Sequence, residues 1–295
     1  YPMKGPRWQD GDYFRTVNLV SHEVLSELAG MKDVRNYRIL YADDKLNSGF
    51  WAMNASYYGL RGFQLYMNPL PLEQFQYMPR RFNIRHYYPL LGAKYYLCNP
   101  CDANLLRDYE FMTDISGYQL YVAKQALSRY SIMNRLVGSY VGPDDFLRKI
   151  NAGGYDYTKE FYVRDSEFAT VANWLGNQSI SSALLKEETP SLHSIRVSVN
   201  TQERAVFILN EYFNKNWKAR VNGVAVNLIP VNANQIGVLL EKGANLVEFD
   251  YRPTLFIQLL WLQRLAVLCV AVYILFSAAT STRVFLKVRE RLSHM

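Results

Sequence analysis

Residues 218–226 read KARVNGVAV, and this short stretch carries the clearest local structural signal in the chain. Asn222 and Gly223 stand between two segments in which apolar and polar side chains alternate. Alternation of this kind predicts β-strands. An Asn-Gly pair between strands favours a two-residue type I′ turn, because both central residues of that turn need a positive φ. The stretch therefore predicts a β-hairpin.

The hairpin lies in a region of short strand-like segments with turn signals between them. These segments include EFYVRD (160–165), HSIRVSVN (193–200), RAVFILNEYF (204–213), QIGVLLE (235–241) and NLVEFDYRP (245–253). Many short strands at such spacing are typical of two packed antiparallel sheets. We therefore expect an antiparallel β-sandwich over residues 151–253, with a further turn at Lys242 and Gly243.

The preceding residues combine helical and strand patterns. Residues 21–30 predict a helix, with Ser21 as its N-cap and Gly30 at its end. A second helix is predicted over 143–153, where Asp144 and Asp145 fall in the first turn. Strands are predicted at 37–42, 90–97, 118–123 and 129–134. The sequence thus predicts an α+β protein, with a mixed α/β domain over residues 1–150 before the sandwich.

An apolar segment follows the sandwich. Residues 265–276 contain no charged side chain, and a frame over 261–280 reaches the roughly 20 residues that a membrane span needs. Trp261 suits the interfacial belt, and Arg264 near the helix end can extend to the headgroups. We therefore expect a transmembrane helix with an interfacial lead-in over 254–282. The alternative is a docked C-terminal helix of a soluble protein.

Basic residues follow this segment, namely Arg283, Lys287, Arg289 and Arg291. By the positive-inside rule they predict a cytoplasmic tail over 283–295, and residues 1–252 are then extracytoplasmic. The net charge of +7 is partly due to this tail. A basic protein can bind nucleic acid or anionic lipid, and we find no nucleic-acid-binding motif. We therefore expect a lipid bilayer as the partner, and no nucleic acid.

Two of the three cysteines, Cys98 and Cys101, form a C-N-P-C motif. Two thiolates alone do not complete a tetrahedral zinc site, and no histidine nearby adds a ligand. A redox motif would need a thioredoxin-like βαβ unit, which the surrounding pattern does not predict. A local disulfide on an exported domain and a pair of free thiols both remain open.

Several stretches in order resemble one protein family. They are YRILY (37–41), YYGLRGFQLY (57–66), LLGAKYYL (90–97), GYQLYVAKQALSRYSIMN (117–134) and the region from Tyr212 to Pro253, with the apolar segment last. Together they are similar to the C-terminal portion of YfhO-type bacterial membrane proteins. Within them, Trp217-Lys218-Ala219 and Asn222-Gly223 match the hairpin of that family. Lys215-Asn216 and Asn245 depart from its usual Pro-Gly and His.

The resemblance implies a parent protein of the GT-C class, a polytopic glycosyltransferase that uses a polyprenyl-phosphate sugar. Its catalytic acid lies between early membrane spans that this sequence does not contain. The chain begins at Tyr1 without a secretory signal peptide, so we expect a processed protein or a piece of a longer one. The resemblance thus implies an accessory extracytoplasmic module with the last span, in the bacterial cell membrane.

No catalytic set is recognisable in the chain itself. The four histidines show no metal-binding spacing, and no nucleophile elbow, P-loop or dinucleotide fingerprint occurs. Acid pairs such as Asp43-Asp44 are common by chance. We therefore predict no catalytic residue, no metal site and no cofactor.

Two groups of residues are candidates for binding. Arg80, Arg81 and Arg85 carry guanidinium groups that suit lipid headgroups or a lipid-linked sugar phosphate, and the alternative is a solvated basic loop, which is the commoner origin of such a group. Trp217, with Tyr212 nearby, is a candidate for stacking on a sugar, whereas the alternative is a Trp in the sandwich core. The competing functional hypothesis is a single-pass surface protein that binds carbohydrate or protein without enzymatic activity. The expected partners are the bilayer, the rest of the parent protein, and a lipid-linked sugar or envelope glycan.

Overall fold

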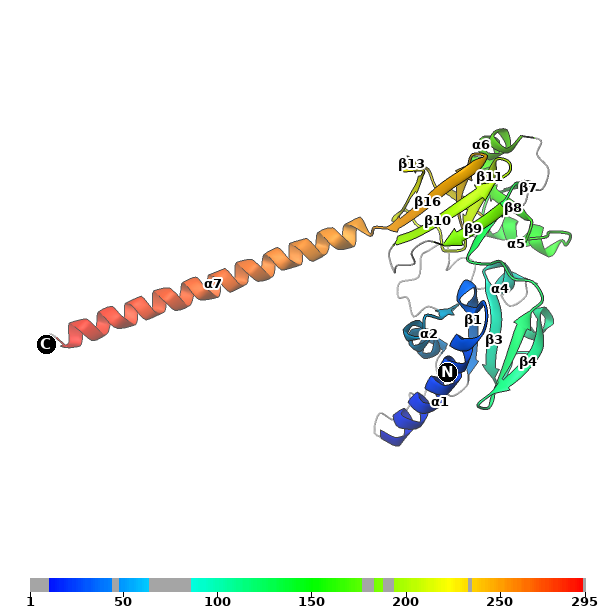
Figure 1. Cartoon of the computed structure of the whole chain (residues 1–295). Coiled ribbons are helices and arrows are strands. Elements are labelled where there is room, and N and C mark those ends of the chain that lie inside the picture. Colours follow the sequence, from blue (N-terminus) through cyan, green and yellow to red (C-terminus); the bar gives the residue numbers. More distant parts are fainter. Residues whose placement is uncertain are drawn as a thin grey trace.

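The computed structural model describes residues 11–43, 48–63, 86–176, 183–187, 194–232 and 235–293. Three sheets form a folded body, and one long helix extends away from it (Figure 1). The predicted α+β class with an apolar C-terminal helix is confirmed.

The first sheet has five strands in the order β2-β1-β3-β5-β4. The β1–β2 and β1–β3 pairs are parallel, whereas β3–β5 and β4–β5 are antiparallel. The strands of this sheet are β1 (Arg38–Asp43), β2 (Arg61–Gly62), β3 (Ala93–Asn99), β4 (Tyr109–Ile115) and β5 (Tyr118–Ala123). Helical segments around it are α1 (Gly11–Gly30), η1 (Val34–Asn36), α2 (Ser48–Tyr57), α4 (Tyr87–Leu90) and η3 (Leu105–Asp108).

The central strands of the first sheet, β1 and β3, are buried on both faces. Ile39 and Tyr41 of β1 pack in one core with Val24 and Leu25 of α1 and Trp51 of α2. Leu40, between them in sequence, belongs to a different core that includes residues of the second sheet. This division follows from the two-residue period of a strand, which sends successive side chains to opposite faces. Each face of the sheet therefore packs against a separate layer.

The second sheet has six strands in the order β6-β11-β15-β14-β8-β7. Its members are β6 (Tyr130–Met133), β7 (Arg135–Tyr140), β8 (Glu160–Arg164), β11 (Ala205–Leu209), β14 (Ile229–Val231) and β15 (Gln235–Leu240). Helices α5 (Pro143–Asn151) and α6 (Asp165–Leu175) contribute Phe146, Leu147, Val171 and Leu175 to the core on one face. Strands from both sides of the expected domain boundary at residue 150 thus share one sheet, and the β7–β8 pair is parallel.

The third sheet is antiparallel, with the order β13-β12-β16-β10-β9. Its strands are β9 (Ala183–Glu187), β10 (Ser194–Thr201), β12 (Trp217–Val221), β13 (Val224–Val226) and β16 (Gly243–Tyr251). Val197 and Phe249 of this sheet share a core with Phe207 and Val238 of the second sheet. The second and third sheets therefore form a β-sandwich, as predicted, but it includes β6 and β7 from before residue 151 and one parallel pair, β7–β8.

Two sequence predictions have opposite outcomes in the structure. Asn222 and Gly223 have φ values of 54° and 79°, so the predicted hairpin turn between β12 and β13 is confirmed. The helix predicted to start at Ser21 begins instead at Gly11, and Ser21 is buried inside it with an exposure of 3%. The proposed cap at Ser21 is therefore wrong, because a residue within a helix has no free first-turn N–H group to bind.

Helix α7 (Thr254–Ser293) is long and apolar enough over Thr254–Ala278 to cross a membrane. None of that window is buried in the folded body. Its apolar side chains are exposed, with Leu255 at 70% and Phe276 at 68%. A helix that packs against no core in its own chain requires another apolar environment, and a bilayer supplies one. The alternative of a helix docked on the body does not fit this exposure.

Candidate functional site

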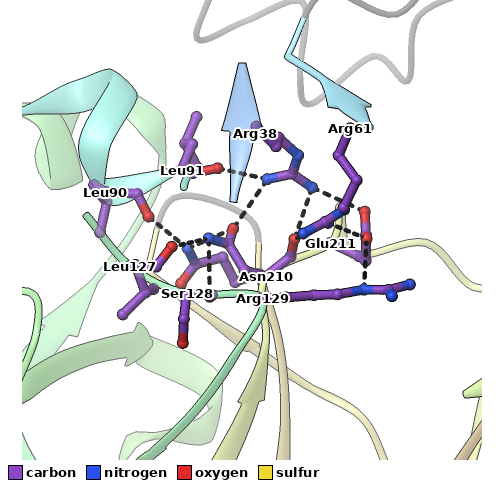
Figure 2. Close-up of polar contacts among 10 residues, drawn as sticks. Arg38, Arg61, Leu90, Leu91, Leu127, Ser128, Arg129, Asn210 and Glu211 are labelled. Atoms are coloured by element: carbon purple, nitrogen blue, oxygen red, sulfur yellow. Dashed lines mark hydrogen bonds and ion pairs between the residues drawn. The ribbon is translucent and has the colours of Figure 1, made fainter. Parts of the chain in front are cut away.

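A buried cluster of charged side chains lies where the first sheet meets the second. Arg38 of β1 and Arg61 of β2 approach Glu211, which follows β11, and Figure 2 shows Arg129 converging on the same carboxylate. Arg38 Nη2 lies 2.8 Å from Glu211 Oε2, and Arg61 donates a hydrogen bond to Oε1. Arg129 Nε lies 3.8 Å from Oε1. We call this set the arginine joint.

The arginine joint has a strong electrostatic consequence for Glu211. Burial alone would raise the pKa of the carboxyl, but the nearby Arg61, Arg38 and Arg129 outweigh it and lower the pKa to about 2. Burial also lowers the pKa of Arg61 to about 10, with repulsion from the other two guanidinium groups and an opposing attraction from Glu211. The negative charge of Glu211 therefore offsets the repulsion among the three guanidinium groups.

A chain of side-chain amides continues from the arginine joint into the second sheet (Figure 2). Arg38 Nη1 donates to Leu91 O at 2.5 Å and to Asn210 Oδ1 at 3.2 Å. Gln235 Nε2 donates to the same Asn210 oxygen and to Leu90 O, both at 3.0 Å. Buried polar groups stabilise a fold only when their hydrogen bonds are satisfied, so this network fixes the two sheets in one arrangement.

The network extends further through Asn232, which is fully buried. Its Nδ2 donates to Gln235 Oε1 at 2.9 Å, and its Oδ1 accepts from the Tyr155 hydroxyl at 2.7 Å. The pKa of Tyr155 is raised well above its usual value, mainly by burial. The hydroxyl therefore stays protonated and acts as a donor. These side chains satisfy one another's hydrogen bonds, which is the pattern of a structural connection between the sheets.

A cavity of about 550 Å³ lies beside η3 and is the better candidate for ligand binding. His86 and Asp108 face each other there, with Nδ1 of His86 3.2 Å from Oδ1 of Asp108. The backbone N–H of His86 also donates to Asp108 Oδ2 at 2.7 Å. His86 adopts the left-handed conformation at φ 61°, which brings its own N–H and its ring to the same carboxylate. Asp108 therefore orients the imidazole.

The other walls of this cavity mix charged, amide and aromatic groups. Lys124 pairs with Glu110 at 2.8 Å. The ring of Tyr157 lies 6.0 Å from that of His86, and its hydroxyl donates to Gln125 O at 2.9 Å. The remaining lining residues are Arg107 and Tyr109. Two cations are balanced by two carboxylates when His86 is neutral, so the cavity is polar without a strong net charge. We call it the His86 pocket.

A second depression, of about 420 Å³, lies on the outer face of the third sheet. Asn200, Asn222, Asn245 and Leu246 are among the residues that line it. Asn222 Oδ1 accepts from the Leu246 N–H at 2.8 Å, which ties the hairpin turn to β16. Asn222 thus adopts the positive φ that the turn requires, and its side chain also binds the turn to β16.

The predicted binding residues fall in different places. Trp217 is half-buried, and its ring centroid lies 5.2 Å from that of Tyr251 and 6.4 Å from that of Phe249. Tyr212 lies instead at the arginine joint, with its ring centroid 5.7 Å from Arg38 Cζ. The two aromatic residues therefore have different neighbours, and Trp217 packs partly buried against the sandwich core. Their role in stacking on a sugar stays a prediction.

The remaining predictions concern the cysteines and the arginine segment. Cys98 and Cys101 form a disulfide with an S–S distance of 2.08 Å. Cys269 lies exposed on α7. Arg80, Arg81 and Arg85 lie outside the residues that the structure describes, so their role stays a prediction. No group of three or more metal-ligating side chains occurs in the described ranges.

No family model, curated protein or solved structure matches this chain. Function is therefore inferred from the geometry of the body and from the residues themselves. The His86 pocket had escaped the sequence analysis, because its parts come from separate segments around residues 86, 108, 124 and 157. A histidine and an aspartate 22 positions apart give no local signal of a pair.

Proposed function

We propose that the chain is the C-terminal extracytoplasmic module and last membrane span of a YfhO-like polytopic glycosyltransferase that uses a polyprenyl-phosphate sugar. The catalytic core is absent from this chain. One observation carries the proposal: strand β16, in the region that resembles the family, ends at Tyr251 and leads through Arg252 and Pro253 directly into the exposed apolar helix α7. Such a junction suits a soluble module that caps the outer side of a membrane-embedded enzyme.

The orientation is proposed from two further features. The Cys98–Cys101 disulfide lies in the body, and disulfides persist mainly in oxidising compartments outside the cytoplasm. The basic residues after the apolar window favour the cytoplasmic side for the C-terminus. We therefore propose the bacterial cell membrane as the location, with the body on its outer face.

Two experiments test this proposal. The reading frame upstream of Tyr1 should encode many apolar spans, and a start codon with a signal peptide directly before Tyr1 would rule the polytopic parent out. For the orientation, a membrane-impermeant thiol reagent is applied to intact cells that carry Glu110→Cys or Ser293→Cys. Glu110→Cys should react at once and Ser293→Cys only after permeabilisation. The reverse order would contradict the orientation.

A second candidate function is a membrane-anchored carbohydrate-binding protein, which the His86 pocket favours. A sugar presents hydroxyl groups that donate and accept hydrogen bonds, together with apolar C–H faces. The pocket offers the matching groups, with an oriented imidazole, carboxylates, an amide and the Tyr157 ring. Its small net charge suits a neutral sugar better than a phosphate.

A glycan array probed with the detergent-solubilised chain tests this candidate. Asp108→Asn should weaken binding of any retained glycan about tenfold or more, because the imidazole loses the charged carboxylate that lies 3.2 Å from its Nδ1. His22→Gln is a matched control, since His22 lines a separate depression with Tyr58. Absence of binding to every glycan, or equal loss in both variants, would count against the candidate.

A further inference from the structure

The junction between the body and α7 combines aromatic and basic side chains. Trp217 and Tyr251 are directly paired across β12 and β16, and their rings make an edge contact. Lys215 and Lys218 are exposed on either side of Trp217 in the sequence, and Arg252 is exposed directly after Tyr251. We call these five residues the proximal rim. Trp, Tyr, Lys and Arg are the residues typical of the membrane–water interface.

The rim is fixed to the start of α7 by the backbone. The Arg252 N–H donates to Asn216 O at 2.8 Å, and the Trp217 N–H donates to Asn214 O at 3.0 Å. Only Arg252 and Pro253 separate β16 from the helix. The turn that carries Lys215 therefore stays close to the first turn of the apolar window.

The first turns of α7 set the height of the rim above the bilayer. Leu255, Phe256 and Ile257 are 70%, 60% and 42% exposed in the chain by itself. Burying these side chains in lipid is favourable, and it brings the rim to the level of the headgroups. Arg264 lies deeper along α7, with its guanidinium over Trp261, and its long side chain can extend toward the same surface.

The charge of the rim selects the kind of headgroup. Lys215, Lys218 and Arg252 carry three positive charges, and the neighbouring carboxylate is Asp250, which lies 3.4 Å from Arg252. Among the described residues, neither Lys215 nor Lys218 has an ion pair within 4.0 Å. A basic side chain at an anionic membrane surface is attracted to it, and the attraction falls off within a Debye length.

We propose that the proximal rim is a docking surface for anionic lipid headgroups, which holds the body against the bilayer that contains α7. The aromatic pair occupies the interfacial layer, and the two lysines contact the headgroup anions. The inference rests on α7 lying in a bilayer, as the proposed function requires. It does not depend on the identity of the parent enzyme.

Lysine acylation of the full chain in lipid nanodiscs tests this docking surface. In discs that contain phosphatidylglycerol, Lys215 and Lys218 should each react about fivefold more slowly than in discs of phosphatidylcholine alone, as expected for a basic group held at an anionic surface. Lys242 provides an internal control, since it is exposed at the far end of β16, roughly 30 Å away along the strand. Its rate should not differ between the discs, and high salt should abolish the difference at the rim.

Hydrogen exchange of residues 211–216 gives a second readout that does not use the lysine amines. Protection by phosphatidylglycerol should be lost in Lys215→Glu/Lys218→Glu and kept in Lys242→Glu. Equal rates in both discs, or a difference that survives high salt, would overturn the proposal. A chain that fails to enter the discs at all would instead overturn the membrane role of α7, and the docking surface with it.

Discussion

Arg38 and Glu211 form an ion pair between the first two sheets, with 2.8 Å between Nη2 and Oε2 across 173 positions of sequence. The Arg38 side chain is 6% exposed and that of Glu211 is 23% exposed. An ion pair of this kind adds little to the stability of the fold. Loss of one partner, however, is strongly destabilising, because it leaves a buried charge uncompensated. Two more guanidinium groups share the same carboxylate, which makes Glu211 the residue on which the joint depends.

We expect Glu211→Gln to lower the free energy of unfolding by about 2 kcal/mol, between the values for exposed and fully buried pairs. The amide cannot compensate Arg38, Arg61 and Arg129. Chemical unfolding in detergent, followed by tryptophan fluorescence, measures the change. Glu110→Gln is the matched control, since Glu110 pairs with Lys124 on an exposed surface and its loss should cost about 0.5 kcal/mol or less. Equal effects of the two substitutions would contradict the central role of Glu211.

The same residue predicts a pH dependence. The folded protein lowers the pKa of Glu211 from an ordinary value of 4.5 to about 2, so its charged form stabilises the fold above the unfolded-state pKa. This contribution is lost as the pH falls through that interval. The midpoint of thermal unfolding should therefore drop between about pH 5 and pH 2, and the drop should be smaller in Glu211→Gln. An identical pH profile in the variant would exclude Glu211 as the source.

Gly92→Ala should lower the free energy of unfolding by about 2–4 kcal/mol, because the substitution adds backbone strain and a steric clash. Chemical unfolding measures the change. Gly92 has a φ of +84°, and a Cβ there would lie 2.7 Å from Asn210 Nδ2 and 3.0 Å from Leu127 O. Gly117→Ala separates the two causes. Gly117 has a φ of +85° and open space around its Cβ position, so it reports the backbone strain alone. If both variants lose the same stability, the close approach to Asn210 carries no energy.

Leu268→Arg tests whether α7 spans the bilayer. Leu268 is 59% exposed within the apolar window, and a charge near the centre of a span costs about 3 kcal/mol in membrane insertion. We expect the variant to shift from the membrane pellet toward the supernatant on alkaline carbonate extraction. Leu268→Phe is the control and should stay in the pellet. Release of the unsubstituted chain into the supernatant would contradict the prediction that α7 spans the bilayer.

Local patterns predicted much of the framework. Strand-like segments identified β5 and β10, the Asn222-Gly223 pair between alternating side chains identified the hairpin, and apolar length identified the span. Strand β4 was missed because a bulge between Phe111 and Thr113 breaks its two-residue period. Helix α6 was also missed, although Asp165 in its first turn and Gly176 at its end, with a φ of 61°, are local signals that could have found it.

The sequence by itself determined the elements whose energetics are local: the φ preferences of a tight turn, the period of a strand face and the length of an apolar helix. Tertiary structure alone decided that Arg38 meets Asn210 and Glu211, that His86 faces Asp108, and that Lys215 lies beside the start of α7. These contacts join segments that are separated in the chain, and they depend on packing between sheets for Arg38, on the approach of α4 to η3 for His86, and on pairing of β12 with β16 for Lys215. No single segment predicts these contacts, because the free energy of each contact depends on both surfaces that form it.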